Sequence, residues 1–331
     1  MAYTQLSLEE RHYIQTQHQL GISQNQIALA LRRHQSNISR ELGRNTGQRG
    51  YRYKQANEKA KLRHANKPKA IKMTDAQKDR IAGLLKQDWS PEQISGRLKQ
   101  EGQETVCHET IYQQVLADKQ TGGKLYLHLR RHPKKYRKRY GVKTGSCSGI
   151  PNRVDIEARP EAANQRERLG DWEADTMIGK GHKGILVTLD ERKSKLRLAL
   201  PALHKTANAV TTAIIALLSG FKDCVHTITF DNGKEFASHE QIAQVIECET
   251  YFAKPYHSWE RGQNENANGL LRQYFPKTMG LLDITTRQVL DAVHKLNSRP
   301  RKCLGFKTPY EVFLELSGMD AEQMVGYALI T

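Results

Sequence analysis

Three acidic residues in the second half of the chain have the type and placement for phosphodiester chemistry. Asp175 lies in an alternating segment, Asp231 directly follows an apolar segment, and Glu265 lies in a predicted helix. Carboxylates gathered at one sheet edge raise one another's pKa, so such a group needs cations. Mg²⁺ and Mn²⁺ prefer oxygen ligands, and two such ions can activate an attacking oxygen and stabilise a leaving one. The alternative is that Asp231 begins an ordinary turn and Glu265 is an exposed helix residue.

The segments around these acids predict an α/β layer domain. Apolar alternation indicates strands at 171–178, 184–190 and 195–202, which follow one another as in an antiparallel meander. A further strand is predicted at 225–230. Between them lies a helical pattern that ends near Gly220, with apolar residues at i, i+3, i+4, i+7 and i+8: Val210, Ala213, Ile214, Leu217 and Leu218. Strands at 171–178 and 225–230 would bring Asp175 and Asp231 to one edge of a sheet.

The helix that carries Glu265 has a polar and an apolar side. At 100° per residue, Glu265 shares a polar stripe with Arg272, while Leu270, Leu271 and Tyr274 lie on the opposite side. We therefore expect the leucines to pack on the sheet and Glu265 to face the same edge as the two aspartates.

The positive charge of the chain is confined to its first half. The net charge is +17, and residues 1–150 hold 29 Lys and Arg against 12 Asp and Glu, whereas residues 151–331 hold 23 of each. A basic half joined to a neutral half predicts a nucleic-acid-binding region in front of a separate domain. A solubility device or a membrane-surface patch is the alternative on charge alone.

The beginning of the chain has the pattern of a helix-turn-helix unit. Residues 8–18 are predicted to be helical, Ser23 and Gln26 form a capping box, and a second short helix spans 36–45. In this unit four residues of the second helix are expected to contact DNA: Ser36, Asn37, Arg40 and Arg44. A three-helix interaction module is the alternative.

The same pattern recurs further along. Ser90 and Gln93 form another capping box with proline at the first helical position, and residues 108–115 predict a second short helix. Thr110, Gln113 and Gln114 would then be available for base edges.

Basic segments follow each unit. Residues 49–72 are predicted to be a solvated helix or linker along a phosphate backbone, and residues 124–143 carry nine Lys and Arg and no acid. The second segment is either a flexible hinge or a DNA contact, and five of its residues are predicted to bind DNA: Lys134, Lys135, Arg137, Lys138 and Arg139. The predicted boundaries are 1–48 and 74–120 for the two helix-turn-helix domains, 49–73 and 121–166 for the linkers, 167–318 for the catalytic core and 319–331 for the tail.

Other classes of protein are disfavoured. No run of about 20 apolar residues indicates a membrane span, and the first residues, MAYTQLSLEERHYIQ, are unlike a secretory signal. The five cysteines are scattered without a C-x-x-C pair, so we expect reduced thiols in the cytoplasm rather than a zinc site or disulfides.

Several motifs together resemble the IS30 family of bacterial insertion-sequence transposases. They run over nearly the whole chain: ISRELGRN, WSPEQISGRL, HETIY, IPNRVDIEARP, GDWEADTMIGK, TFDNGKEF, PYHSWERGQNENANGLLRQYFPK and NSRPRKCLGFKTPYEVF. The resemblance implies a multidomain protein, with N-terminal all-α helix-turn-helix units followed by an α/β ribonuclease-H-like catalytic domain.

The same resemblance implies a DDE triad of Asp175, Asp231 and Glu265, because Glu265 stands at the family's spacing from Asp231. Glu260, the rival glutamate, precedes Gly262 and falls outside the helix. The triad would bind two Mg²⁺ per active site, with Mn²⁺ able to substitute. Further residues are expected to position DNA or support the site: His257, Asn268, Arg272 and, beside Asp175, Glu173. Residues Asn297, Arg299 and Arg301 serve either substrate contact or packing.

The expected function is a DNA transposase that binds terminal inverted repeats and cleaves and transfers strands into target DNA. It is expected to be a homodimer or higher homo-oligomer, cytoplasmic, nucleoid-associated and without membrane contact. Two alternatives remain: a catalytically silent DNA-binding regulator derived from a transposase, and a nuclease that cleaves without joining.

Overall fold

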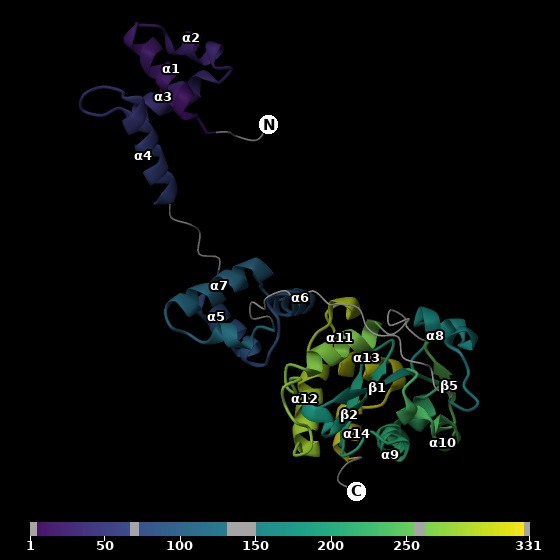
Figure 1. The fold of residues 1–331 in the computed structure, drawn as a ribbon. Coiled ribbons are helices and arrows are strands. Elements are labelled where there is room, and N and C mark those ends of the chain that lie inside the picture. Colours follow the sequence, from purple (N-terminus) through teal and green to yellow (C-terminus); the bar gives the residue numbers. More distant parts are fainter. Residues whose placement is uncertain (1–4, 67–72, 131–149, 255–261, 328–331) are drawn as a thin grey trace. The chain divides into compact units, whose positions relative to one another are not determined.

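Two units make up the chain, Met1–Ile71 and Lys72–Thr331. The structure is a computed structural model, and it describes residues 5–66, 73–130, 150–254 and 262–327 (Figure 1). Among the described residues, no helix has the length and apolar character required to cross a membrane.

Three short helices begin the first unit, as the sequence predicts. Ser7 and Ser23 start α1 (Leu8–Gln19) and α2 (Gln24–Ala30) with capping boxes. The ring of His34 accepts a hydrogen bond from the Ser36 N–H at 3.2 Å and so caps α3 (Gln35–Asn45). One buried isoleucine from each helix forms the core of this small domain: Ile14, Ile27 and Ile38.

A fourth helix, α4 (Tyr53–Ala65), belongs to the same domain rather than to a solvated linker. Tyr51 and Ala56 are buried in the core with the isoleucines. Arg63 donates to Asn45 Oδ1 at 2.5 Å and to the Arg44 carbonyl at 3.2 Å, which satisfies the carboxyl end of α3. The predicted linker from residue 49 thus contains a helix that packs on the first domain through Ala56, with Tyr51 buried just before it.

The second unit begins with another three-helix group. It contains α5 (Asp75–Lys86), α6 (Pro91–Gln100), α7 (His108–Gln120) and the 3₁₀ turn η1 (Leu125–His128). The predicted capping box at Ser90 is present, and α7 runs five residues beyond its predicted end. Ile81, Ile94 and Ile111 are buried at its centre.

A five-stranded sheet follows. The strands are β1 (Asp171–Ile178), β2 (Ile185–Glu191), β3 (Arg197–Ala202), β4 (Thr227–Phe230) and β5 (Glu249–Phe252), in the order β3-β2-β1-β4-β5. The first three strands form the predicted antiparallel meander, and β4 and β5 run parallel to β1. This order and these directions are those of the ribonuclease-H-like fold. Strand β5 is absent from the strands that the sequence predicts.

Helices cover both faces of the sheet (Figure 1). Trp172 and Ala174 of β1 pack in one core with α9 (Ala207–Leu218), α10 (His239–Ile246) and α13 (Pro309–Ser317). Met177 packs on the other face with α11 (Gly262–Leu271) and α12 (Thr286–Asn297). Both faces of β1 are therefore buried, and polar side chains on this strand need partners inside the protein.

Shorter elements complete the fold: η2 (Ile156–Ala158), α8 (Glu161–Gln165), η3 (Lys180–His182), η4 (Ser219–Cys224), η5 (Lys234–Phe236), η7 (Lys302–Leu304) and α14 (Ala321–Tyr327). Ile156 and Ala163 are buried, and Asp155 bridges to Phe252 of β5. The end of the predicted linker, from residue 150 onward, is thus packed against the sheet.

Candidate active site and DNA-binding surfaces

The parallel pairing of β1 and β4 brings Asp175 and Asp231 to one edge of the sheet. Glu173 pairs with Thr229 in this ladder. Asp175 and Asp231 each lie two residues beyond this pair, in the same chain direction. Both aspartates are partly exposed, so this edge is open to solvent.

The turn after β4 fixes the position of Asp231. The Asp231 Oδ1 atom accepts from the Gly233 N–H at 2.9 Å, which closes an Asx turn. Asn232 donates to the Ala253 carbonyl at 2.7 Å and accepts from Arg153 at 2.5 Å. The turn is thus held by the neighbouring strand and by the packed segment before the sheet.

A buried carboxylate that no sequence pattern singles out lies near this turn. Glu235 accepts from the Thr176 hydroxyl at 3.0 Å and pairs with Lys205 at 2.8 Å. Thr176 follows Asp175 directly, so Glu235 links the turn after β4 to β1. The one sequence feature that could have drawn attention to Glu235 is its position in the motif TFDNGKEF, four residues after Asp231.

Both carboxylate oxygens of Asp175 are held by uncharged donors. The Thr176 N–H donates to Oδ1 at 2.8 Å, and the amide of Asn268 donates to Oδ2 at 2.8 Å. Asn268 lies on α11, three residues after Glu265, so this contact brings the helix that carries Glu265 to Asp175.

A buried arginine determines how Asn268 is oriented. Arg197 of β3 donates to Asn268 Oδ1 at 3.0 Å and to the Ala267 carbonyl at 2.7 Å. Its guanidinium is held in turn by Asp190 at 2.8 and 2.6 Å. Because the amide oxygen of Asn268 faces a guanidinium, its NH₂ group faces Asp175. The sequence alone does not reveal Arg197, whose role depends on neighbours from three separate elements.

Glu265 is exposed on α11, whereas Leu270 and Leu271 are buried against the sheet, as the helical stripe predicts. Arg272 donates to the Ile178 carbonyl at 2.9 Å, and burial lowers the pKa of its guanidinium. Among the described residues, no three His, Cys, Asp or Glu side chains are grouped so that they could hold a metal ion. The assignment of the triad stays a prediction, as does DNA positioning by Asn268 and Arg272.

Three residues that the sequence associates with the site or with substrate make contacts within the protein. Glu173 is buried and paired with Arg192. Asn297 bonds the backbone of Arg197 at 3.0 and 2.8 Å, and Arg299 contacts Tyr274, so both serve packing. Six predicted residues lie outside the described part of the chain, as does the rival Glu260: Lys134, Lys135, Arg137, Lys138, Arg139 and His257.

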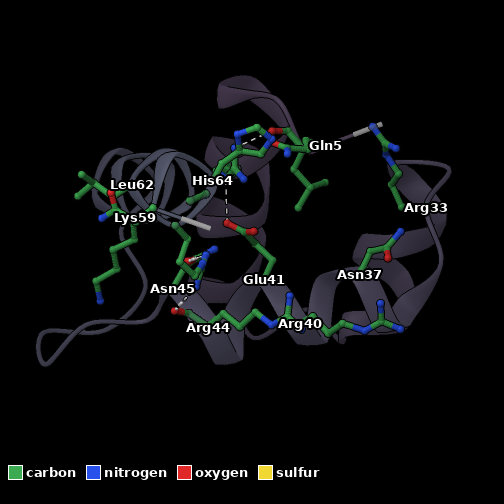
Figure 2. Close-up of a pocket in the computed structure, with 15 residues that line it drawn as sticks. Gln5, Arg33, Asn37, Arg40, Glu41, Arg44, Asn45, Lys59, Leu62 and His64 are labelled. Carbon is green, nitrogen blue, oxygen red and sulfur yellow. Dashed lines mark hydrogen bonds and ion pairs between the residues drawn. The ribbon is translucent and has the colours of Figure 1, made fainter. Parts of the chain in front are cut away.

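The first unit carries a basic cavity of about 900 Å³ between α3 and α4. Figure 2 shows Asn37, Arg40 and Arg44 of α3 and Lys59 and His64 of α4 around it. Arg40 and Arg44 are exposed, while Ser36 bonds His34 and Arg40. The acid in the lining, Glu41, is bound by Arg11 at 2.8 Å. The predicted contact helix α3 therefore shares a positive surface with α4, the helix that the sequence places in a linker.

In the second unit, the predicted contact residues lie along α7. Gln113 is exposed and Thr110 partly exposed, whereas the Oε1 atom of Gln114 is buried and has no hydrogen-bond partner among the described residues. Gln114 is thus less accessible than predicted, because α7 packs that side against the domain core.

Comparisons with known proteins agree with this architecture. Residues 2–45 match a helix-turn-helix domain family, and residues 44–115 match a homeodomain-like domain family. The chain is 45% identical over 310 residues to the transposase for insertion sequence element IS4351 of Bacteroides fragilis, covering 93% of this chain and 95% of that protein. It is 36% identical over 322 residues to transposase InsI for insertion sequence element IS30C of Escherichia coli (strain K12), covering 94% and 84%. The catalytic core domain of BIV integrase is 26% identical and covers 44% of this chain and 93% of that structure, with a TM-score of 0.36.

Helix-turn-helix domains in front of a ribonuclease-H-like domain, with this likeness to transposases, define a DNA transposase. The chain belongs to the IS30 family of transposases.

Proposed function

We propose that Asp175, Asp231 and Glu265 form the catalytic triad of this transposase and bind two Mg²⁺ ions, which Mn²⁺ can replace. The observation that carries the proposal is the convergence of three elements at one sheet edge. Glu173 pairs with Thr229, two residues before Asp175 and Asp231 respectively, and Asn268 ties the Glu265 helix to Asp175 at 2.8 Å. All three side chains offer the oxygen ligands that these ions prefer.

The chemistry consists of two displacements at phosphorus. In the first, a water oxygen attacks the phosphodiester at the element end, the bond to the 3′ oxygen breaks, and a 3′-hydroxyl is released. In the second, this hydroxyl attacks a target phosphodiester, and the target's 3′ oxygen leaves as the new bond forms. When bound, the metal ions would activate the attacking oxygen and stabilise the leaving one.

The protein's own residues hold the reacting groups in place. Asn268 and the Thr176 N–H orient the two oxygens of Asp175, and the Asx turn orients Asp231. The helix-turn-helix domains supply DNA affinity, with recognition of the terminal inverted repeats assigned to α3 and α7. The two element ends must be held together during transfer, so we expect a homodimer or larger assembly.

Labelled duplexes that contain an element end and its flanking DNA test this proposal. The wild type, incubated with Mg²⁺ or Mn²⁺, is expected to nick the end and join it to a second duplex. Asp231→Asn is expected to bind the duplex and do neither, while Asp223→Asn, the same change at an exposed site in η4, behaves as the wild type. Calorimetric titration with Mn²⁺ gives a readout that is independent of cleavage. Binding of Mn²⁺ should be lost in Asp231→Asn and retained in the wild type and in Asp223→Asn.

Each of the other functions predicts a distinct result. A protein that binds the end and cuts with neither metal is a regulator. One that cuts without forming joined product is a nuclease. Either result contradicts the proposal.

A further inference from the structure

A second cavity of the first unit, of about 1280 Å³, lies beside the connection between α3 and α4. Its walls come from the end of α1, from the connection itself and from the first half of α4. Among the described residues that line it there is no Asp or Glu, whereas five are basic: His18, Arg49, Arg52, Lys54 and Lys59. A surface of this composition attracts a polyanion.

The connection between α3 and α4 is a tight hairpin of residues 47–50. Gly47 and Gly50 exchange backbone hydrogen bonds, both at 3.1 Å, around a tip made of Gln48 and Arg49. Gly50 has φ 84°, a left-handed conformation that glycine commonly adopts where a hairpin turn ends. Figure 1 shows the connection as a loop that projects from the helices. The hairpin therefore presents Arg49 at a tip whose shape is set by the backbone.

Both ends of the hairpin are fixed to the domain. Lys59 of α4 donates to the Thr46 carbonyl at 3.1 Å, directly before the hairpin, and Tyr51 is buried in the core directly after it. The side chain of Gln55 lies against the hairpin, because a Cβ atom on Gly47 would be 2.6 Å from Gln55 Oε1. A loop that is already fixed loses little conformational entropy when it binds a partner.

The charges of Arg49 and Arg52 are not neutralised within the domain. Both side chains are exposed, and neither forms an ion pair or a side-chain hydrogen bond with a described residue. The acids that flank them in the sequence are Glu41, which Arg11 binds at 2.8 Å, and Glu58, which lies outside the cavity lining. Two guanidinium groups are thus available to an anion.

The hairpin lies close to the helix that is predicted to contact DNA. Arg49 follows Asn45, the last residue of α3, by four positions. A chain spans at most about 3.6 Å per residue, so the tip lies within about 14 Å of that end of the helix. The major groove of B-DNA is about 12 Å wide. A helix in the groove therefore brings the tip within reach of a phosphate strand that borders it.

We propose that this hairpin, with the adjoining Arg52, is a DNA backbone contact of the first domain. Arg49 and Arg52 bind phosphates on the strand that borders the groove entered by α3. A guanidinium group can donate two parallel hydrogen bonds to one phosphate. The proposal rests on the assignment of end recognition to α3 under the proposed function. It adds a contact that holds the duplex in place without reading its sequence.

Fluorescence anisotropy of the full-length protein, without divalent metal ions, tests the contact on two labelled duplexes. One duplex contains an element end and the other has an unrelated sequence. Arg49→Gln should lower the affinity for both by the same factor, about eightfold at 0.1 M salt, and reduce the slope of log affinity against log salt by about 0.9. Arg52→Gln should act in the same way. The ratio of the two affinities should not change, because phosphate contacts carry no sequence information.

Two kinds of control separate a shaped contact from overall charge. Lys61→Gln removes an exposed charge of α4 outside the cavity lining and should change the slope less. Gly50→Ala keeps every charge, and nothing lies within 4 Å of the added Cβ atom, but alanine is disfavoured at φ 84°. It should weaken binding to both duplexes, whereas Gly50→Asn should not, because asparagine tolerates this conformation. Equal unfolding temperatures would show that both variants fold.

Three results would overturn the proposal. The first is an unchanged affinity and slope in Arg49→Gln and Arg52→Gln, and the second is an equal effect of Lys61→Gln. The third is a loss confined to the element-end duplex, which would mean that the hairpin reads bases. Asn37→Ala, on α3, tests the underlying assignment separately, because it should lower the ratio of the two affinities. If it does not, recognition by α3 fails, while a uniform loss in Arg49→Gln still supports the hairpin contact.

Discussion

Arg97 of α6 and Glu311 of α13 form a two-point ion pair, at 2.7 and 2.6 Å, between the second helix-turn-helix domain and the catalytic domain. Arg97 also donates to the Phe306 carbonyl at 3.3 Å, and Gln93 donates to the Pro300 carbonyl at 2.8 Å. These contacts are made by α6, the first helix of the predicted helix-turn-helix pair. The second helix, α7, therefore keeps its exposed residues accessible while α6 fixes this domain to the sheet domain.

This ion pair predicts a specific dependence of stability on pH. Arg97 lowers the pKa of Glu311 below its usual 4.5, so the pair contributes fully above that value and its contribution is lost as pH falls below it. Glu311→Gln keeps the shape of the side chain and its place in the Thr308 capping box. We expect it to lower the free energy of unfolding by about 1 kcal/mol at pH 7, a small value because the Glu311 side chain is 42% exposed.

Urea unfolding at several pH values measures this effect. The difference between wild type and Glu311→Gln should shrink as pH falls below 4.5 and through the lowered pKa of Glu311. Glu315→Gln, on the same helix and paired with Lys307, is the control and should change stability by only a few tenths of a kcal/mol. A difference that stays constant as the pH is lowered through the acidic range would show that the charge is not responsible.

Two helical glycines in neighbouring helices should respond oppositely to alanine. A Cβ atom on Gly96 would lie 2.1 Å from the ring of Phe306, whereas nothing lies within 4 Å of one on Gly83. Alanine favours a helix by about 1 kcal/mol over glycine, so Gly83→Ala should raise the unfolding temperature. Gly96→Ala should lower stability by about 1–3 kcal/mol, because the ring must move.

Thermal unfolding of both variants checks this contrast. Phe306 has φ 66°, so its backbone is already in a strained region and has little freedom to move away. If Gly96→Ala were as stable as Gly83→Ala, α6 would not pack on Phe306 in solution.

Truncation of Asn268 should separate catalysis from DNA binding, on the proposed assignment of Asp175. Asn268→Ala removes the donor that holds Asp175 Oδ2 and leaves Arg197 without one of its acceptors. A hydrogen bond to a charged group contributes about 1.5–3 kcal/mol, so we expect strand cleavage to slow by at least about tenfold. The affinity for an end duplex should stay within about twofold, since the amide of this residue is already bonded to Asp175 and Arg197.

Cleavage rates at several Mg²⁺ concentrations, with duplex affinity measured in parallel, test this expectation. Gln241→Ala, an amide truncation at an exposed position of α10, should leave both quantities unchanged. A loss of affinity that equals the loss of rate would instead place Asn268 in DNA contact, as the family resemblance implies.

The sequence predicts those parts of the fold that have a strong hydrophobic periodicity or a clear capping motif. The alternation in DWEADTMI defines β1 to the residue, and the capping boxes at Ser23 and Ser90 define the starts of α2 and α6. Strand β5 escapes prediction because four residues, ETYF, show too short a pattern. Helix α4 resembles a linker because two buried residues, Tyr51 and Ala56, are a weak apolar signal in a basic segment.

The candidate site is predictable only in part for a similar reason. Asp175 lies in a predicted strand, and Asp231 directly follows another. Parallel pairing of these two strands, β1 and β4, is enough to bring the two residues to the same edge of the sheet. Arg197 and Glu235 act through neighbours from distant segments, Asn268 and Thr176 respectively. No local pattern marks such pairs, because their partners are set by the tertiary fold.

The cavity between α3 and α4 predicts that DNA contacts extend beyond the first recognition helix. Arg40 and Arg44 are exposed on α3, and Lys59 lines the same cavity from α4, where it donates to the Thr46 carbonyl at 3.1 Å. Arg40→Gln and Lys59→Gln should each weaken binding to an end duplex and lower the salt slope by about 0.9 if each loses one phosphate contact. Lys61→Gln removes the same charge from α4 outside the cavity lining and should change the slope less.

Fluorescence anisotropy titrations between low and moderate salt measure these slopes. If Lys59→Gln and Lys61→Gln weaken binding equally, α4 contributes only its overall charge, whereas a larger effect of Lys59→Gln assigns the cavity wall to the DNA interface.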